Sequence, residues 1–274
     1  MARKLFCEIS PLTYRIATAR CILTRRIRDG ISRRRFARQR GEEVLPCVIY
    51  RHNSLIRRRL GNVDMRLQEN KAVNLGLAAP HLDRLLIRPG ETFSFWRLVG
   101  PTTARRGYRE GLTIASGAAS SGIGGGMCQM TNLIHWMVLH SDLEIVEHHH
   151  HSGLDLFPDH GRVIPFGTGT SVVYNYLDYR VYNPTERTYQ LLIRTDGEYL
   201  RGQLRADSPQ PHTYHIAVEG EYFSREGEHV YRNGEVYRTC VDPVTGNTLS
   251  RRLLQRNHAR VCYDTQGLAV VEGG

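Results

Sequence analysis

The chain has 274 residues, of which 41% are hydrophobic and 23% charged; this is typical of a folded globular protein and excludes a disordered one. Its net charge of +10 is unevenly distributed, because residues 1–60 carry 16 of the 37 Lys and Arg residues but only 4 acidic residues. No apolar run approaches the ~20 residues that cross a bilayer as a helix, so the sequence predicts no such span.

The N-terminal residues do not have the pattern of a secretory signal peptide. Glu8 ends the first apolar run, and Arg15 and Arg20 divide the next one. Six cysteines in such a chain favour thiols in a reducing compartment over a disulfide framework. We therefore expect a cytoplasmic protein.

Residues 1–42 are predicted to form a basic arm that contains an amphipathic helix. Ser10 and Pro11 suit the N-cap and the first helical position, and Gly30 suits the end. The apolar residues at helical spacing are Leu12, Ile16, Ala19, Leu23 and Ile27. Such a helix can contact an anionic membrane surface peripherally, or it can pack on a domain with its arginines in solvent. We expect a separate arm, of which the first 40 residues make few contacts with the main domain.

The two arginine runs, Arg33–Arg35 and Arg57–Arg59, do not indicate a nucleic-acid-binding protein. Neither run is interleaved with aromatic residues that could stack on bases, and no recognition motif surrounds either. We interpret both runs as solvated faces and expect no nucleic-acid partner.

Residues 43–274 are predicted to form one α+β domain. The first-half elements are a strand over Val44–Tyr50, a helix over Leu67–Ala79, and a short helix or turn over Leu82–Leu85 that leads through Leu86 and Ile87 to a turn over Arg88–Glu91. Core anchors at Phe93, Phe95 and Trp96 and a small-residue loop over 116–126 follow. Strands follow at Val172–Tyr176, Asp178–Tyr182, Tyr189–Arg194 and Tyr199–Leu204, with hairpin turns at Asp196-Gly197, Arg232–Gly234 and Thr245–Asn247. We expect a helical first half packed on a mainly antiparallel β-sheet.

A glycine run and the helix that follows it form the candidate site. Gly124, Gly125 and Gly126 end the small-residue loop, and a helix is predicted to begin at Met127 or Cys128. The apolar stripe of this helix is Met130, Leu133, Ile134 and Met137. The opposite face, with Cys128, Thr131, Asn132 and His135, is left available for function.

Cys128 is the candidate nucleophile. In the first turn of a helix, unpaired amides and the macrodipole stabilise a thiolate, which predicts the most acidic thiol of the chain. The amides of Gly124–Gly126 could contribute to an oxyanion hole with help from Gln129, and Asn132 could orient a substrate. The layout resembles that of the cysteine helix in papain-like hydrolases, so the chemistry expected is that of a cysteine hydrolase or transferase.

The candidate base lies in the run His148–His151, which follows the strand-like segment Leu143–Glu147. Alternation along a strand sends His149 and His151 to one face, and we expect His151 first, then His149, within reach of Cys128. His135 is about 10 Å from Cys128 along the helix, which is too far for a direct hydrogen bond.

Other interpretations of the same residues stay open. Cys128 can instead be a small buried hydrophobic residue, and the site is then a binding cleft that performs no catalysis. A zinc site that draws on Cys128, His140 and the histidine run lacks CxxC or HExxH spacing, so we expect no metal and no other cofactor. Three cysteines in strand-like segments are expected to lie outside the site: Cys47, Cys240 and Cys262.

Two ordered blocks resemble the signatures of the VanW family. They are Arg88–Trp96 and Gly124–Leu133, with further matches at Asn70–Leu75, Glu147–His151 and Asp178–Asn183. The resemblance covers roughly residues 61–205, which we take as the core of the domain. It implies an accessory role in glycopeptide (vancomycin) resistance or cell-envelope metabolism, with peptide-like cell-wall material as the partner.

The sequence departs from the family pattern at one position. Many relatives have an aspartate in a Gly-x-Asp-Ala-Thr-Val stretch, where this chain has Gly169. If that acid completes a catalytic triad, Asp178 is the nearest substitute here. The leading hypothesis is a cysteine-centred site that acts on peptide-like wall material. Its rival is a non-catalytic module that binds a wall precursor or a partner protein.

Overall fold

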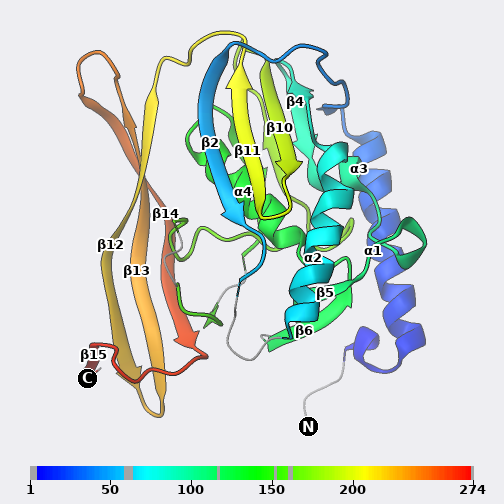
Figure 1. Cartoon of the computed structure of the whole chain (residues 1–274), viewed down its shortest axis with the longest axis vertical. Coiled ribbons are helices and arrows are strands. Elements are labelled where there is room, and N and C mark those ends of the chain that lie inside the picture. Colours follow the sequence, from blue (N-terminus) through cyan, green and yellow to red (C-terminus); the bar gives the residue numbers. More distant parts are fainter. Residues whose placement is uncertain (1–4, 59–63, 116–117, 151–152, 160–162, 273–274) are drawn as a thin grey trace.

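A computed structural model describes residues 5–58, 64–115, 118–150, 153–159 and 163–272 (Figure 1). The α-helices in these ranges are α1 (Pro11–Ile31), α2 (Met65–Ala78), α3 (Phe95–Val99) and α4 (Met127–Leu139), and short 3-10 helices cover Phe6–Glu8, Ala79–His81 and Ala104–Arg106. None of these helices is long and apolar enough to cross a membrane. Helices and strands are both present, as expected, but strands alternate with the helices, so the first half is not purely helical.

The central layer is an antiparallel sheet in the order β2-β11-β10-β3. Its strands are β2 (Cys47–Leu55), β3 (Leu85–Ile87), β10 (Tyr189–Thr195) and β11 (Tyr199–Ala206). The predicted turn at Asp196-Gly197 joins β10 to β11 and is confirmed. Helix α4 crosses this sheet at Gly202, where a Cβ atom would lie only 2.7 Å from the side chain of Leu133. The candidate helix is thereby fixed on the core.

A second sheet brings together residues that are far apart in the sequence. Its order is β1-β4-β9-β7, with β1 (Arg35–Phe36), β4 (Glu91–Ser94), β7 (Glu144–Glu147) and β9 (Arg180–Tyr182). Strand β1 pairs with β4 in parallel, and the other pairs are antiparallel. Phe93, Phe95 and Trp96 are buried at the end of β4 and in α3, which confirms them as core anchors.

The third sheet consists mainly of three long antiparallel strands, β12 (Thr213–Glu226), β13 (His229–Val241) and β14 (Thr248–Val261). Short strands β15 (Val270–Glu272) and β8 (Leu154–Asp155) pair in parallel at its edges. In Figure 1 these long strands stand on the opposite side of the molecule from α1. The turn predicted at Thr245–Asn247 joins β13 to β14.

Three local predictions were wrong. Arg232–Gly234 lies inside β13, next to a register shift against β12, and not in a hairpin turn, because a glycine in a strand also suits a bulge. A loop was expected over residues 116–126, but the described part of this segment contains strand β6 (Ala118–Ile123), which pairs with β5 (Glu110–Ala115). The segment Val172–Tyr176 forms a turn around Asn175, whose left-handed φ of 51° ends any extended run.

Helix α1 begins as predicted but is not a loosely attached arm. The Ser10 hydroxyl accepts the Thr13 amide, and the helix continues one residue past Gly30 before it ends. Arg25 donates two hydrogen bonds to Glu147, at 2.7 and 2.6 Å, and Asp29 accepts two from Arg180, each at 2.7 Å. The expectation that the first 40 residues make few contacts is therefore wrong, because Arg25 and Asp29 have charged partners on the second sheet, β1 pairs with β4 and Ala37 is buried.

The apolar stripe of α1 faces away from the domain. Leu12, Ile16, Leu23 and Ile27 are all at least 50% exposed. The half-buried residues of α1 include Ala17, Cys21, Arg25 and Asp29, on the other side of the helix. The helix thus contacts the domain with its polar side and presents its apolar side outward.

Candidate functional site

The glycine run forms the sharp turn that starts α4. Gly124 and Gly126 have left-handed φ angles of 79° and 105°, and α4 begins at Met127 as predicted. Each glycine is pressed against protein atoms. Added Cβ atoms would lie 2.3 Å from side-chain or backbone atoms of Thr102, Gly111 and Lys71, respectively. These contacts, and not the approach of a substrate, account for the three glycines.

Two amides expected in an oxyanion hole are already used. The Gly124 amide donates to the Arg109 carbonyl at 2.9 Å, and the Gly125 amide donates to the Gly122 carbonyl at 3.1 Å. Asn74 of α2 fixes the same turn, because its side-chain amide donates to the Gly125 carbonyl at 2.9 Å. The oxyanion-hole assignment is therefore wrong for Gly124 and Gly125 in this conformation.

Cys128 lies in the first turn of α4, half-buried, but its thiol is not activated as predicted. Burial raises the pKa of the Cys128 thiol, and the backbone amides of Val172 and of Cys128 itself lower it by less. The thiol is therefore protonated at neutral pH, because its apolar surroundings disfavour a thiolate more than the amides favour one. The expectation of an unusually acidic thiol is wrong.

Gln129 and Asn132 also have partners within the protein. The Gln129 side chain donates to the Ser54 hydroxyl and to the Leu55 carbonyl of β2, each at 2.9 Å. The Asn132 side-chain carbonyl accepts the amide and the hydroxyl of Thr170, at 2.6 and 2.8 Å. Both side chains hold neighbouring segments against α4 in this conformation, and their assignment as substrate-binding residues stays a prediction.

Three imidazoles lie close together at α4: His135 is on the helix face that also carries Asn132, and His148 and His150 follow β7. His135 shares a hydrogen bond with the Tyr179 hydroxyl at 3.0 Å, and its ring centre lies 4.2 Å from that of His148. The rings of His148 and His150 are 4.0 Å apart, and His148 donates to the Gly169 carbonyl. Burial lowers the pKa of His148 to about 4 and lowers the pKa of His135 and His150 as well. All three are uncharged at neutral pH.

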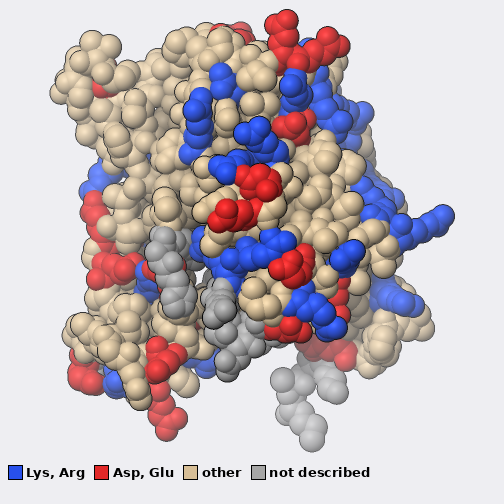
Figure 2. All heavy atoms as spheres, in the orientation of Figure 1, with Lys and Arg blue, Asp and Glu red and all other residues tan. Residues whose placement is uncertain are grey.

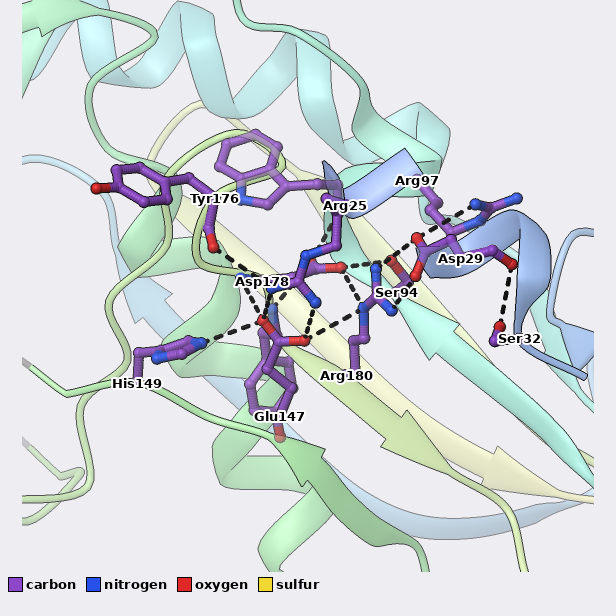
Figure 3. Close-up of polar contacts among 12 residues, drawn as sticks. Arg25, Asp29, Ser32, Ser94, Arg97, Glu147, His149, Tyr176, Asp178 and Arg180 are labelled. Carbon is purple, nitrogen blue, oxygen red and sulfur yellow. Dashed lines mark hydrogen bonds and ion pairs between the residues drawn. The ribbon is translucent and has the colours of Figure 1, made fainter. Parts of the chain in front are cut away.

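His149, one of the two predicted bases, belongs to a different cluster. Its Nε2 donates to Glu147 at 3.1 Å, and Figure 3 shows Glu147 between His149, Arg25 and Arg180. Within the part of the chain that the structure describes, His149 therefore contacts a carboxylate whose charge Arg25 already neutralises. His151, the base expected first, lies outside the described residues.

Asp178 does not replace the missing triad acid. It is 1% exposed, and its carboxylate accepts hydrogen bonds from the Ser94 hydroxyl, the Trp96 amide and the Arg180 guanidinium (Figure 3). Arg180 in turn bonds Asp29 of α1. These groups form a buried ion network that joins α1 to the second sheet, which periodicity alone could not indicate.

The zinc alternative has no support among the described residues. His140 lies at the end of α4, twelve residues or about 18 Å from Cys128, and it stacks on Tyr50 at 3.8 Å. No group of three or more His, Cys, Asp or Glu side chains in the described ranges is placed to hold a metal ion. The six cysteines form no disulfide in the described part of the chain, and Cys262, expected to be packed in a strand, is exposed just after β14.

Lys71 is a residue of this region that the sequence reasoning did not identify. It lies on the buried face of α2, 6% exposed, with its stem against Gly126. Burial, reinforced by the charges of Arg58 and Arg57, lowers the pKa of Lys71 to about 7. A signal was present, because Lys71 stands at helical spacing between Gln68 and Leu75, both of which are buried.

A cleft of about 310 Å³ opens between α1 and α3. It is lined by Arg26, Arg38 and Arg97 together with the rings of Trp96 and Tyr174. Its acidic lining residue, Asp29, is bonded to Arg180 and Arg97 and is therefore neutralised. Clefts of this size, with a few converging polar groups, are typical of small-ligand sites.

Comparison with known proteins gives a family. A model described as "VanW like protein" matches residues 70–205. The chain is 37% identical over 235 residues to vancomycin B-type resistance protein VanW of Enterococcus faecalis (strain ATCC 700802 / V583), which covers 83% of this chain and 82% of that protein. It is 30% identical over 129 residues to the uncharacterized protein YoaR of Bacillus subtilis (strain 168), covering 46% of this chain and 39% of that one. No solved structure matches. The segment matched by the family model contains the glycine turn, α4 and the network residues of β7 and β9, and the chain belongs to the VanW family.

Proposed function

We propose that this chain is an accessory protein of glycopeptide resistance or cell-envelope metabolism that binds an anionic, peptide-like cell-wall precursor without reacting with it. The family supports the biological setting, because the relative from Enterococcus faecalis carries vancomycin B-type resistance in its name. The site supports binding over catalysis, because the amides of Gly124 and Gly125 are bonded to protein carbonyls and burial raises the pKa of Cys128.

One observation carries the binding proposal: the cleft between α1 and α3 combines three arginines with two aromatic rings. Guanidinium groups bind carboxylates through paired, charge-assisted hydrogen bonds. Trp96 is anchored by its own bond to the Leu177 carbonyl, and Arg97 lies 4.1 Å over the Phe36 ring. Because Trp96 and Arg97 are already held in place, they lose little conformational entropy when a ligand binds. Together with its arginines, this makes the cleft suitable for the free carboxylate end of a peptide.

Calorimetry with the full chain tests this assignment. We expect a synthetic peptide with a free C-terminal carboxylate to bind at least about tenfold more tightly than the same peptide capped as an amide, because a charge-assisted bond contributes about 1.5–3 kcal/mol. Arg38→Gln should weaken binding of the carboxylate peptide by a similar factor. The matched control is Arg252→Gln, at an exposed position on β14. Equal affinity for both peptides, or no measurable affinity for either, would contradict the proposal.

A cysteine-centred reaction is the second candidate, and one observation favours it. Cys128, Asn132 and His135 lie on one face of α4, where the neutral imidazoles of His148 and His150 also gather. Neutral imidazoles can accept a proton, so a conformation with the segment around Thr170 displaced could form a Cys–His pair.

Alkylation followed by peptide mass spectrometry separates the two candidates. With the protein alone, we expect Cys128 to react more slowly with iodoacetamide than the exposed Cys262 between pH 6 and 8, because burial keeps the Cys128 thiol protonated. Cys128→Ser identifies the labelled peptide. If Cys128 instead reacts faster than Cys262, or becomes the faster site when the carboxylate peptide is added, the catalytic candidate is favoured.

A further inference from the structure

The outward side of α1 is an apolar surface that no described part of the chain covers. Leu12, Ile16, Leu23 and Ile27 lie within roughly 60° of one another around the helix at 100° per residue. They are 50–65% exposed. The surface continues toward the N-terminus through Phe6 and Ile9, which are also more than half exposed. Contiguous apolar patches of this kind mark interaction surfaces rather than ordinary solvent-facing helices.

Arginines border this apolar surface on both sides. On the helical wheel, Arg15 and Arg26 lie along one edge and Arg20 along the other, with Arg28 farther round the helix beyond Arg20. Figure 2 shows Lys and Arg side chains along the side of the molecule where Figure 1 places α1. The acidic residue of α1, Asp29, faces the domain and is bonded to Arg180. The outward side of α1 is therefore apolar along its middle, positive along its edges and without a carboxylate.

The ion network holds this surface in position. Arg25 and Asp29 lie roughly opposite the apolar stripe, and their partners Glu147 and Arg180 are on β7 and β9. An amphipathic helix usually buries its apolar stripe against its own domain. Here the polar side makes the attachment, so the stripe remains available for a partner.

We propose that the outward side of α1 binds the surface of an anionic phospholipid bilayer. The stripe inserts at the boundary between headgroups and acyl chains, and the flanking arginines pair with lipid phosphates. Charge complementarity favours this occupant over a second copy of the chain, because two copies facing each other through α1 would bring the same arginines together. The proposal does not depend on which ligand the cleft binds. Its tests therefore leave the cleft residue Arg38 unaltered.

Vesicle co-sedimentation of the full chain tests the proposal. We expect binding to vesicles of phosphatidylcholine mixed with an equal amount of phosphatidylglycerol, and at least about tenfold weaker binding to phosphatidylcholine alone. The combined variant Ile16→Ser/Leu23→Ser/Ile27→Ser should weaken binding to the anionic vesicles by at least about tenfold. Arg15→Gln/Arg20→Gln/Arg28→Gln should do the same, and its remaining binding should depend less on salt.

Matched controls lie on the far sheet. Val244→Ser/Leu249→Ser/Val271→Ser changes three exposed apolar residues around β14 and β15, and Arg252→Gln/Arg260→Gln changes two exposed arginines of β14. Both controls should bind like the unaltered chain. All of the substituted positions are exposed, so thermal unfolding should show that each variant is folded.

Three results would overturn the proposal. The first is equal binding of the α1 variants and the far-sheet controls. The second is no binding of the unaltered chain to anionic vesicles at low salt. The third is self-association of the unaltered chain in sedimentation equilibrium that Ile16→Ser/Leu23→Ser/Ile27→Ser abolishes, which would assign the surface to a second copy. Binding of the carboxylate peptide by these variants, measured separately, should be unchanged whichever result is found.

Discussion

Replacing Arg180 with methionine should lower the free energy of unfolding by about 3–5 kcal/mol, the range observed when one member of a buried ion pair is removed. Arg180 is 2% exposed and donates to Asp178 and to both oxygens of Asp29. Its Nε also lies 3.5 Å from Glu147. Methionine fills part of the volume but leaves these buried carboxylates without their main cation, and they cannot all be rehydrated in place.

Urea unfolding measures this loss, and Arg252→Met on the exposed part of β14 is the matched control. The control should change stability by no more than about 0.5 kcal/mol, because it removes no buried partner. A loss below about 1 kcal/mol for Arg180→Met would contradict the proposed importance of the network. It would show that water or the remaining arginines compensate the carboxylates.

The same network predicts an acid sensitivity. Burial alone would raise the pKa of Asp29, but the hydrogen bonds and charge of Arg180 outweigh it, so the pKa is lowered. The pKa of Glu147 is lowered in the same way, chiefly by Arg25. Carboxyl groups with lowered folded-state pKa contribute stability that is present above their unfolded pKa of about 4 and is lost as pH falls through the folded value. In Arg180→Met, Asp29 loses its principal compensation and its folded-state pKa rises toward or above the unfolded value. Urea midpoints of this variant should therefore fall less between about pH 5 and 3 than those of the unaltered chain.

The elements that depend on local chemistry could be predicted from the sequence. Gly126 with the stripe at Met130 and Leu133 placed the start of α4 correctly. Asp196-Gly197 gave a correct hairpin turn, and Ser10 a correct N-cap. Each of these signals involves residues within a few positions of one another, so a single sequence contains all the information needed.

The wrong predictions have a common physical cause, because each depends on contacts between residues that are distant in the sequence. The orientation of α1 follows from Arg25 and Glu147, which are 122 positions apart, and no periodicity encodes such a pairing. The helix pattern of Leu12 and Ile27 correctly indicated amphipathicity but could not indicate which side faces the domain. At the candidate site, the first turn of α4 suggested an acidic thiol, but burial of Cys128 against the hydrophobic core has the opposite effect.

The glycine run shows how one motif fits two physical explanations. Glycines before a helix allow a substrate to approach the backbone, and they also allow two chain segments to approach each other. The sequence suggested the first explanation. The structure gives the second, because Gly125 lies against Gly111 of β5 and its carbonyl accepts the Asn74 amide. The distinction can be measured as stability, independently of any ligand.

Gly125→Ala should therefore destabilise the fold by about 3 kcal/mol, toward the upper end of the range for overpacking a buried site. The added Cβ would lie 2.3 Å from the carbonyl carbon and oxygen of Gly111 and 2.7 Å from the Leu112 carbonyl oxygen, and all three are backbone atoms. Strand β5 must move to relieve these contacts, and the bond between Asn74 and the Gly125 carbonyl is then disturbed. Because the strain arises from backbone and not from a flexible side chain, a change of rotamer cannot remove it.

Gly30→Ala is the matched control, because nothing lies within 4 Å of the added Cβ and the residue is helical in α1. It should leave stability unchanged or raise it by up to about 1 kcal/mol, since alanine favours a helix over glycine. Urea unfolding of both variants gives the comparison. If Gly125→Ala keeps the stability of the unaltered chain and loses only peptide binding, the glycine turn faces a ligand after all. If Gly125→Ala loses stability while its folded fraction still binds the carboxylate peptide, the glycines serve to pack the turn against β5. Peptide binding is then unaffected because the arginine-lined cleft lies elsewhere, between α1 and α3.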